Sequence, residues 1–305
     1  MKKIYSIGGG KGGSGKSFIA ASLGALFARE GSRVVLVDLD LGASNLHTFL
    51  NLKNPPRGLD EFIDKKIAHL EDVALATSVQ NLYLISSARC SLEVANLFYA
   101  QKKKLISAIE NLPFDYVLLD LGPGTHFNTL DFFLTASEGV FVATPEPTAI
   151  ENTFRFIKSI YLRKLKQSLK EADIWYLCRD EIVAMSRNGL TSPIDFINIL
   201  VKKDIEQGKI FEDLLNGLKL RLVMNKVRGQ IRENLGRQIV EVCNRHLYPG
   251  FDLLETINYD SRVYDAILSK QIFIGKYPYT KTAVALQKAA RKLKQEQPIA
   301  IGLES

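Results

Sequence analysis

The sequence predicts an α/β fold in which helices cover both faces of a mostly parallel, twisted sheet. Short apolar runs alternate with longer segments of helical periodicity, as expected of repeated strand–helix–strand units. A glycine-rich loop separates the first apolar run from the first helical segment, and two of the apolar runs end in aspartate. In an open parallel sheet, ligands bind outside the carboxyl ends of the strands, so the loop and both aspartates belong to one predicted site.

The predicted strands are short and rich in Val, Ile and Leu, which is typical of strands buried on both faces. Strands are expected at 4–7, 33–38, 82–85, 116–120, 140–144, 220–225 and 254–257. Helices are expected at 16–28, which Gly31 closes, and at 92–112, 149–169 and 281–295. Ser192 and Pro193 suit the cap and first position of a further helix over 194–203.

Length and composition indicate one domain with an insertion. The chain has 305 residues, 46% of them hydrophobic, and no internal repeat, low-complexity tract or flexible linker. We expect a single domain over 1–305 with a helical insertion at about 165–217. This stretch holds the only tryptophan, Trp175, which would mark a partner surface if exposed, although the role of core anchor for the insertion is favoured. We hypothesise that the insertion recruits a partner protein.

Targeting signals and cysteine usage predict a cytoplasmic protein. No apolar run reaches the roughly 18 residues of a membrane-spanning helix, and the N-terminus lacks the form of a signal peptide. Cys90, Cys178 and Cys243 lie far apart and form no C-x-x-C pair. We therefore expect reduced thiols, no structural metal and no iron–sulfur cluster.

The net charge of +7 resides in the C-terminal half of the chain. Residues 1–150 hold 14 Lys and Arg against 15 Asp and Glu, whereas residues 151–305 hold 26 against 18. A basic half suggests an anionic partner such as nucleic acid or an acidic membrane surface, although a solvated lysine-rich surface explains it equally well. The candidate contact residues are Arg163, Lys164, Lys166 and Lys170, or Arg221, Arg228, Arg232 and Arg237.

The glycine-rich loop fits the phosphate-binding pattern G-x-x-x-x-G-K-[ST] and predicts a P-loop NTPase. Glycines let the backbone turn its N–H groups toward a phosphate, and the following helix directs its positive end to the same anion. Lys16 should bridge the β- and γ-phosphates, and the Ser17 hydroxyl should bind Mg²⁺. The predicted nucleotide-binding segment comprises Gly10, Lys11, Gly12, Gly13, Ser14, Gly15, Lys16, Ser17 and Phe18.

Three aspartates at strand ends are candidates for the metal site and for hydrolysis. Asp38 and Asp40 follow the second predicted strand, and Asp120 ends the strand at 116–120. One of the first two can order water bound to Mg²⁺ while the other positions the attacking water, and Asp120 is expected to hold Mg²⁺. The alternative is that these aspartates are ordinary acidic strand ends that cap the next helix.

Three further residues complete the predicted site. Asn45 is a small polar residue just beyond the first acidic pair, and Gly122 is placed to offer a backbone N–H to the γ-phosphate. Asn225 ends another buried strand, and its amide can pair with adenine. Because a guanine site usually has N-K-x-D and this chain lacks that aspartate, we expect ATP/ADP rather than GTP.

Four motifs together resemble the MinD/ParA family of ATPases, whose phosphate loop is a deviant Walker A. They are K-G-G-S-G-K-S, V-D-L-D-L-G-A-S-N-L, L-L-D-L-G-P-G and T-P-E-P-T-A-I. The resemblance covers most of residues 1–160 and resumes at 220–295, and Asn45 with Asp120-Leu121-Gly122 is similar to the MinD-like branch that includes the FlhG/FleN flagellar-number regulators. Ser14 departs from the valine common at its position.

The resemblance implies an ATP-dependent homodimer that sandwiches two nucleotides. Lys11 would then reach the phosphates held by the other subunit, which ties slow hydrolysis to dimerisation and to an activating partner protein. By the same resemblance, catalysis involves Lys11, Lys16 and Asp40, and Asp38 lies near Mg²⁺. Such switches position or regulate a cellular structure: the division site, a flagellum, a chromosome or plasmid, or other cargo.

Two alternative functions and two alternative surfaces stay open at this point. The first alternative to the switch is an ATP-dependent metabolic ligase or synthase of the same superfamily. The second is a scaffold that binds nucleotide without hydrolysing it. The last predicted helix, at 281–295, carries lysines around an apolar side and lacks Phe or Trp, which favours packing on the core over membrane insertion. Peripheral contact with the inner membrane, or nonspecific contact with DNA at the nucleoid, would use the basic C-terminal half.

Overall fold

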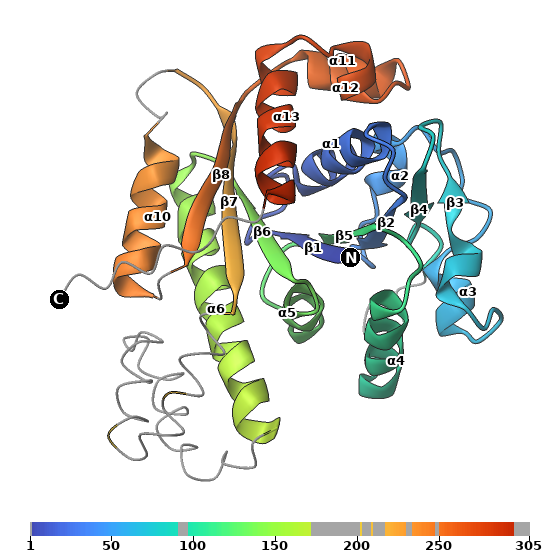
Figure 1. Cartoon of the computed structure of the whole chain (residues 1–305), viewed down its shortest axis with the longest axis horizontal. Coiled ribbons are helices and arrows are strands. Elements are labelled where there is room, and N and C mark those ends of the chain that lie inside the picture. Colours follow the sequence, from blue (N-terminus) through green and yellow to red (C-terminus); the bar gives the residue numbers. More distant parts are fainter. Residues whose placement is uncertain are drawn as a thin grey trace.

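The structure is a computed structural model that describes residues 2–90, 97–171, 202, 209, 217–229, 234–247 and 250–295. At its centre lies an eight-stranded sheet with the strand order β3-β4-β2-β5-β1-β6-β7-β8. Neighbouring strands of this sheet run parallel except for β3 and β4 at one edge. Figure 1 shows helices on both faces of the sheet, as the sequence predicts.

All seven predicted strands are present, with bounds that differ by a few residues. The strands are β1 (Lys3–Gly8), β2 (Val34–Leu39), β3 (Leu75–Ala76), β4 (Leu82–Ile85), β5 (Tyr116–Leu121), β6 (Glu138–Ala143), β7 (Lys219–Val227) and β8 (Phe251–Asn258). The two-residue β3 was not predicted, because a strand of that length carries no periodic pattern.

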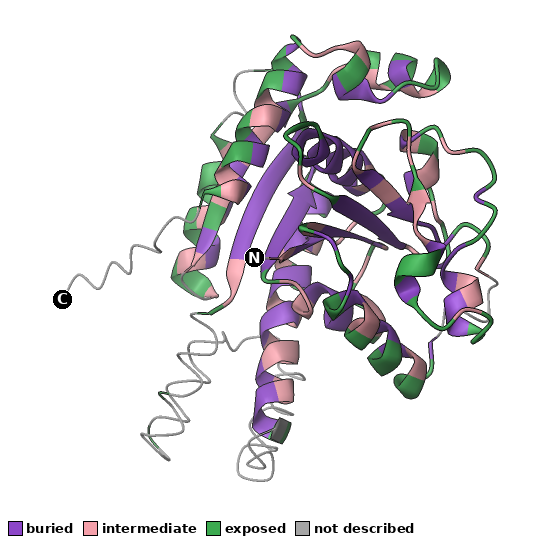
Figure 2. Cartoon of the chain, turned by 45° about the vertical axis from the view of Figure 1, so that its right-hand side comes forward, coloured by how far each residue is buried: buried purple, intermediate pink, exposed green. Residues whose placement is uncertain are grey.

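The helices form one layer on each face of the sheet. One layer contains α1 (Lys16–Arg29), α2 (Leu46–Phe49), α11 (Arg262–Leu268), α12 (Phe273–Lys276) and α13 (Lys281–Lys294). The other contains α3 (Leu59–Ile63), the 3-10 helix η1 (Leu70–Val73), α4 (Tyr99–Glu110), α5 (Phe127–Leu134), α6 (Pro147–Glu171) and α10 (Leu235–His246). Each layer buries its own apolar cluster against the sheet, and Figure 2 shows exposed residues on the outer sides of the helices.

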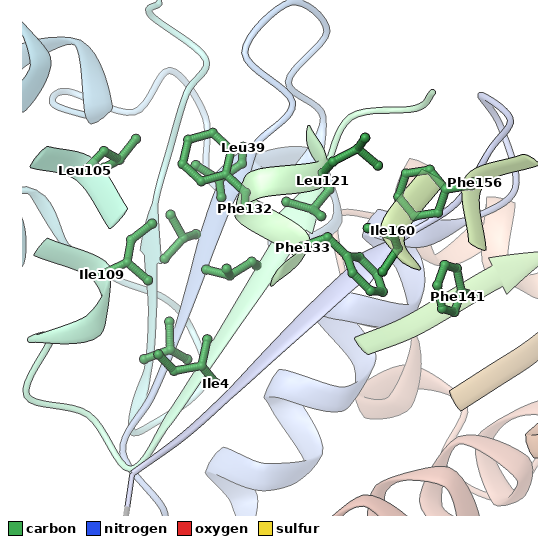
Figure 3. Close-up of a cluster of buried hydrophobic side chains, with 14 of the residues drawn as sticks. Ile4, Leu39, Leu105, Ile109, Leu121, Phe132, Phe133, Phe141, Phe156 and Ile160 are labelled. Carbon is green, nitrogen blue, oxygen red and sulfur yellow. The ribbon is translucent and has the colours of Figure 1, made fainter. Parts of the chain in front are cut away.

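Phenylalanines fix α5 and α6 against the strand that leads into the glycine-rich loop (Figure 3). The ring centroids of Phe133 and Phe141 lie 4.7 Å apart, and Phe156 packs edge-on against both rings at 5.5 Å. A Cβ on Gly8 would lie 2.9 Å from a ring carbon of Phe133, and one on Gly139 would lie 2.3 Å from it. The absence of side chains at these glycines therefore lets α5 approach β1 and β6 closely.

The final helix, α13, packs on the core, as expected from its pattern. Leu286, Ala290 and Leu293 are buried against α1 and β8. Lys292 donates to the carbonyl oxygen of Leu254 at 2.6 Å, and Lys294 pairs with Glu30. Its apolar face is thus occupied in this structure. Within the described part of the chain, no helix is both long and apolar enough to cross a membrane.

The helix predicted at 92–112 is wrong at its start and slightly long at its end. Among the described residues the helix is α4, Tyr99–Glu110, and residues 97–98 are not helical. The Phe98 N–H donates to the Gln101 side chain at 2.9 Å, which satisfies a free backbone donor at this terminus. Two longer helices, α5 and α10, were missed by the sequence analysis.

The predicted insertion at about 165–217 lies almost wholly outside the described residues. Residues 165–171 continue α6, which extends well past its neighbour α5 (Figure 1). The helix predicted at 194–203 and Trp175 lie outside the described residues, apart from residue 202.

Candidate nucleotide-binding site

A cavity of about 620 Å³ opens at the carboxyl edge of the sheet. The glycine-rich loop and the first turn of α1 line one part of it, and the end of β8 with the residues after it lines another. The loop and helix residues are Gly12, Gly13, Gly15, Lys16, Ser17 and Phe18, and the residues from the end of β8 onward are Asn258, Tyr259, Asp260, Ser261, Val263 and Tyr264. Asp40 and Asn225 line the cavity as well. The structure thus brings the loop, an acidic strand end and the end of β7 together around one space, as the strand-end argument predicts.

The loop backbone requires glycine at particular positions. Gly13 and Gly15 have φ angles of +75° and +95°, in the left-handed region that side chains disfavour. A Cβ on Gly15 would lie 2.3 Å from the Asn225 amide nitrogen, and one on Gly10 would lie 2.2 Å from the carbonyl oxygen of Asn152 in α6. The loop is therefore packed between α6 and β7 in a shape that side chains would disrupt.

Lys16 is buried at the start of α1, where it faces the acidic strand ends. Burial lowers the pKa of its ammonium group, and the neighbouring carboxylates of Asp120 and Asp40 oppose that effect. Its Nζ lies 3.5 Å from the carbonyl oxygen of Lys11, a long hydrogen bond. An ammonium group held this loosely in a buried, glycine-lined space is suited to bind an anion.

The two deepest carboxylates share a buried region behind the loop. Asp38 accepts hydrogen bonds from the Ser44 hydroxyl at 2.6 Å and from the Asp40 N–H at 3.1 Å, yet burial raises its pKa to about 6. Burial and the charge of Asp38 raise the pKa of Asp120 to about 8, against a hydrogen bond from the Ser17 hydroxyl. Two carboxyl groups in this environment are more stable as anions when a cation is close.

These residues fit a Mg²⁺ ion held jointly with a nucleotide. Oδ1 of Asp120 is buried and accepts no hydrogen bond, and the Ser17 hydroxyl lies against the same carboxylate. Among the described residues, no three His, Cys, Asp or Glu side chains form a ligand cluster. Mg²⁺ tolerates this, because it usually keeps waters and phosphate oxygens and takes only one or two protein ligands. Asp38 and Asp120 could act on it through water.

Asp40 and Gly122 meet at the cavity edge. A Cβ on Gly122 would lie 3.0 Å from Oδ1 of Asp40, so the glycine allows close approach of β2 and β5 at their ends. Asp40 is only partly buried and faces the cavity, whereas Asp38 is fully buried. The structure therefore separates the two aspartates into an inner and an outer carboxylate.

Lys11 has partners that the sequence analysis missed. Its Nζ contacts Oε2 of Glu146 at 2.5 Å and Oγ1 of Thr148 at 3.3 Å, both at the start of α6. The lysine and the glutamate side chains are 39% and 58% exposed, so the pair is accessible to solvent. Glu146 belongs to T-P-E-P-T-A-I, one of the four family motifs. Its place in that motif could have indicated that Glu146 lies near the loop.

Asn225 holds the loop as well as lining the cavity. Its Nδ2 donates to the carbonyl oxygen of Ser14 at 2.8 Å, which leaves Oδ1 as an acceptor. Ser14 is buried, and its hydroxyl has no partner. Phe18 and Asn45 line the cavity, and the Asn45 amide donates to the carbonyl oxygen of Ala43 at 2.7 Å.

The far end of the cavity was missed by the sequence analysis. Asn258 ends β8 and Tyr259 and Asp260 follow it, just as the acidic residues lie at the ends of β2 and β5, so the strand-end argument applied here too. Arg262 donates to Asp260 through its backbone N–H and its guanidinium at 2.8–3.0 Å. Burial would raise the pKa of Asp260, but these bonds hold it below its usual value.

Several basic residues named as candidate nucleic-acid contacts have internal partners instead. Arg163 binds Asp131 through Nε at 2.6 Å and Nη2 at 2.8 Å. Arg221 is buried and binds Asp252 at 2.8 Å. The prediction that these two arginines are free surface cations is therefore wrong. Asp131 binds Arg163, and Asp252 on the edge strand β8 binds Arg221. Arg232 lies outside the described residues.

Comparison with known proteins identifies similar chains. Residues 5–273 match the CobQ/CobB/MinD/ParA nucleotide binding domain. The chain is 24% identical to the antiactivator FleN of Pseudomonas aeruginosa over 95% of its own length and 86% of that protein. It is 32% identical to the septum site-determining protein MinD of Synechocystis over 75% of its own length and 91% of that protein. Some relatives match over less: the chain spans 58% of MinD from Thermotoga maritima.

The fold agrees with solved structures. The septum site-determining protein MinD of Pyrococcus horikoshii, solved in complex with Mg-ADP, aligns with a TM-score of 0.66 at 21% sequence identity over 97% of each chain. At this identity the similarity concerns the fold.

Proposed function

The chain belongs to the CobQ/CobB/MinD/ParA nucleotide-binding family, and we propose that it is an ATP-hydrolysing dimerisation switch of the MinD/ParA type. The observation that carries this proposal is the convergence of Lys11, Lys16, Ser17, Asp40 and Asp120 at one edge of the sheet. A switch needs all of them: a phosphate cradle, a metal site, a group for water and a cation that leaves its own subunit.

Phosphate binding would use the loop and Lys16. The loop N–H groups and the N-terminus of α1 face the cavity, and the Lys16 ammonium exchanges its long contact for phosphate oxygens. Ser17, with Asp38 and Asp120 acting through water, would hold Mg²⁺, which neutralises charge on the β- and γ-phosphates. A cation there also relieves the repulsion between the two buried carboxylates.

Hydrolysis would depend on the outer carboxylate. Asp40 faces the cavity and is the group that can orient the attacking water. Gly122, against Asp40, can offer its N–H to the γ-phosphate and change position when that phosphate leaves. Loss of the phosphate would thus change the conformation of the segment that connects β5 to α5.

Lys11 would act on the nucleotide of a second subunit. In the single chain its ammonium contacts Glu146 and Thr148 rather than the cavity. Because this ion pair is exposed, it is weak, at about 0–1 kcal/mol, and dimerisation can exchange it for phosphate. A cation supplied in trans stabilises charge in the transition state as an arginine finger does, and it makes turnover slow without a partner.

The base end of the cavity favours adenine over guanine. The Asn225 amide is oriented by the Ser14 carbonyl, so its oxygen is left to accept from the amino group of adenine. Guanine presents a carbonyl at that position, and Asp260, a carboxylate that lines the cavity after β8, is occupied by Arg262. We therefore propose ATP/ADP as the ligands.

The partners would be a second copy of the chain, an activating protein, and an anionic surface met by the basic C-terminal half. We propose a single domain over 1–305 whose insertion near 165–217 recruits the activator. Exposed Lys281 and Arg291 of α13 remain as candidates for surface contact, whether to DNA or peripherally to a membrane from the cytoplasm.

The solution mass of Asp40→Ala tests this proposal. With ATP and Mg²⁺ we expect a dimer that does not turn over, and with ADP a monomer, both measured by light scattering. A monomer under both conditions would contradict the switch and favour a metabolic ligase, for which a small-molecule substrate would be sought. A wild-type dimer with ATP but no phosphate release would favour a scaffold without turnover.

A further inference from the structure

Of the aromatic side chains exposed at the edge of the sheet that carries the nucleotide cavity, three lie where α4 and α5 begin. Phe98, Tyr99 and Phe127 are 77%, 75% and 68% exposed. Tyr99 and Phe127 begin α4 and α5, and Phe98 caps α4. Because α4 precedes β5 and α5 follows it, both helices start at the carboxyl edge of that strand (Figure 1). We call these three residues the aromatic rim.

The rim adjoins the residues proposed for hydrolysis. A hollow of about 550 Å³ beside the nucleotide cavity is lined by Leu97 and Phe127 together with Asp40, Gly122 and Pro123. Phe127 therefore borders the same hollow as the segment proposed to sense the γ-phosphate. A surface that covers the rim would also close this hollow over Asp40.

A buried ion network supports two of the rings. The ammonium of Lys102 lies 6.0 Å from the Tyr99 ring centroid, and the guanidinium of Arg163 lies 5.0 Å from that of Phe127. Both cations bind the carboxylate of Asp131, which is itself buried. Because Asp131 fixes the cations, each ring lies against a charge that cannot move away. Rings ordered before association lose less entropy when a partner covers them.

We propose that the aromatic rim is the outer part of the surface that a second copy of this chain covers in the ATP-bound dimer. This inference rests on the proposed function, and it assigns the apolar contact between the two subunits to the aromatic rim. The rim lies at the edge from which Lys11 would cross, and a two-fold contact places that edge opposite itself. The rim is continuous with the hollow that Asp40 lines, which favours a second copy, because the second copy must cover the nucleotide site. A membrane or an activating protein could bind an aromatic surface far from that hollow.

The area of the rim is consistent with this role. At about 200 Å² for an aromatic side chain, the exposed parts of the three rings amount to roughly 450 Å² in each copy. Two copies would contribute about 900 Å², roughly half of the 1,600 Å² buried in a stable interface of ordinary size. The phosphate cradle and Lys11 are polar and supply little apolar area, so an ATP-dependent dimer needs such a source elsewhere on the same edge.

The test is the dimer affinity of Phe98→Ser/Tyr99→Ser/Phe127→Ser in the Asp40→Ala background, with ATP and Mg²⁺. We expect the dimer dissociation constant to rise at least about 30-fold, since buried aromatic residues dominate interface energies. Affinity for a fluorescent ATP analogue in the monomer should change less than about twofold. Tyr279→Ser is the matched control, because Tyr279 is 94% exposed and outside the rim; it should dimerise normally.

The outcomes separate this inference from the proposed function. If Asp40→Ala alone fails to dimerise with ATP, the proposed function fails. If it dimerises and the triple variant does so with equal affinity, only the inference is overturned; accompanying loss of binding to phosphatidylglycerol vesicles would assign the rim to a membrane. Should the triple variant lose nucleotide affinity, the dimer affinity of Phe98→Lys is measured instead, because this variant keeps Tyr99 and Phe127 in place. It puts a positive charge on the rim of each copy, so we expect weaker dimerisation, and unchanged dimerisation would overturn the inference.

Discussion

Asp131 joins three helices through one buried carboxylate, and its substitution should destabilise the protein strongly. Oδ1 accepts from Arg163 Nε at 2.6 Å and Gln167 Nε2 at 2.9 Å, and Oδ2 accepts from Arg163 Nη2 at 2.8 Å and from Lys102. The side chains of Asp131, Lys102 and Arg163 are 5%, 10% and 25% exposed. Asp131→Asn keeps the shape and removes the charge, so two poorly solvated cations face a neutral amide.

The magnitude follows from the burial of the partners. Breaking a buried pair by removing one charge costs about 3–5 kcal/mol, because the remaining charge is left uncompensated. At about 2–4 °C per kcal/mol, the melting temperature should fall by roughly 6–20 °C. Asp64→Asn is the control: its pair with Lys66 is exposed, and we expect a change within about 0.5 kcal/mol.

The pH dependence of unfolding gives a second readout of the same carboxylate. Burial would raise the pKa of Asp131, but the hydrogen bonds from Arg163 and Lys102 outweigh it and hold the pKa below its usual value. Below about pH 4 the unfolded chain takes up a proton at this aspartate before the folded chain does, so stability falls as the pH falls. Asp131→Asn should show a weaker loss of stability across that acid range.

Thermal unfolding followed by circular dichroism at pH 7 and at about pH 3 measures both effects. Adding Lys102→Met to Asp131→Asn should restore part of the loss, since it removes one uncompensated cation. If Asp131→Asn melts within about 1 °C of the unaltered protein at pH 7, the reasoning about this network is refuted.

The remaining predictions concern the nucleotide site. Lys16→Ala should abolish ATP binding in calorimetry, and measurable heat of binding at micromolar ATP would contradict its role. Lys11→Ala should keep ATP affinity within about threefold but lower turnover at least about tenfold; full activity would refute a lysine acting in trans. Gly15→Ala should weaken ATP binding and lower the unfolding free energy by about 1–3 kcal/mol, because its Cβ would meet the Asn225 amide. Asn225→Asp should lower ATP affinity at least about tenfold in the same titration, as the bond to the Ser14 carbonyl is lost.

The sequence by itself determined seven of the eight strands that the structure describes, the helices α1, α6, α13 and most of α4, and the phosphate loop. These are local signals: β-branched runs, helical periodicity, and glycines at the spacing that a phosphate requires. Asp38, Asp40 and Asp120 lie at the ends of predicted strands, and parallel strands place their carboxyl ends at one edge of the sheet. The sequence therefore predicted that these three aspartates would converge. The strand after which Asn258, Tyr259 and Asp260 lie was predicted too, although these residues were not recognised as part of the cavity.

Only the tertiary structure decided which charges are free and which have internal partners. Arg163 and Lys102 belong to basic stretches in the sequence, yet both bind Asp131, a residue about 30 positions away whose helix was not predicted. Lys11 rests on Glu146, and the inner and outer roles of Asp38 and Asp40 differ by burial alone. Ion pairs and burial depend on side chains brought together from distant segments, and no local pattern encodes them.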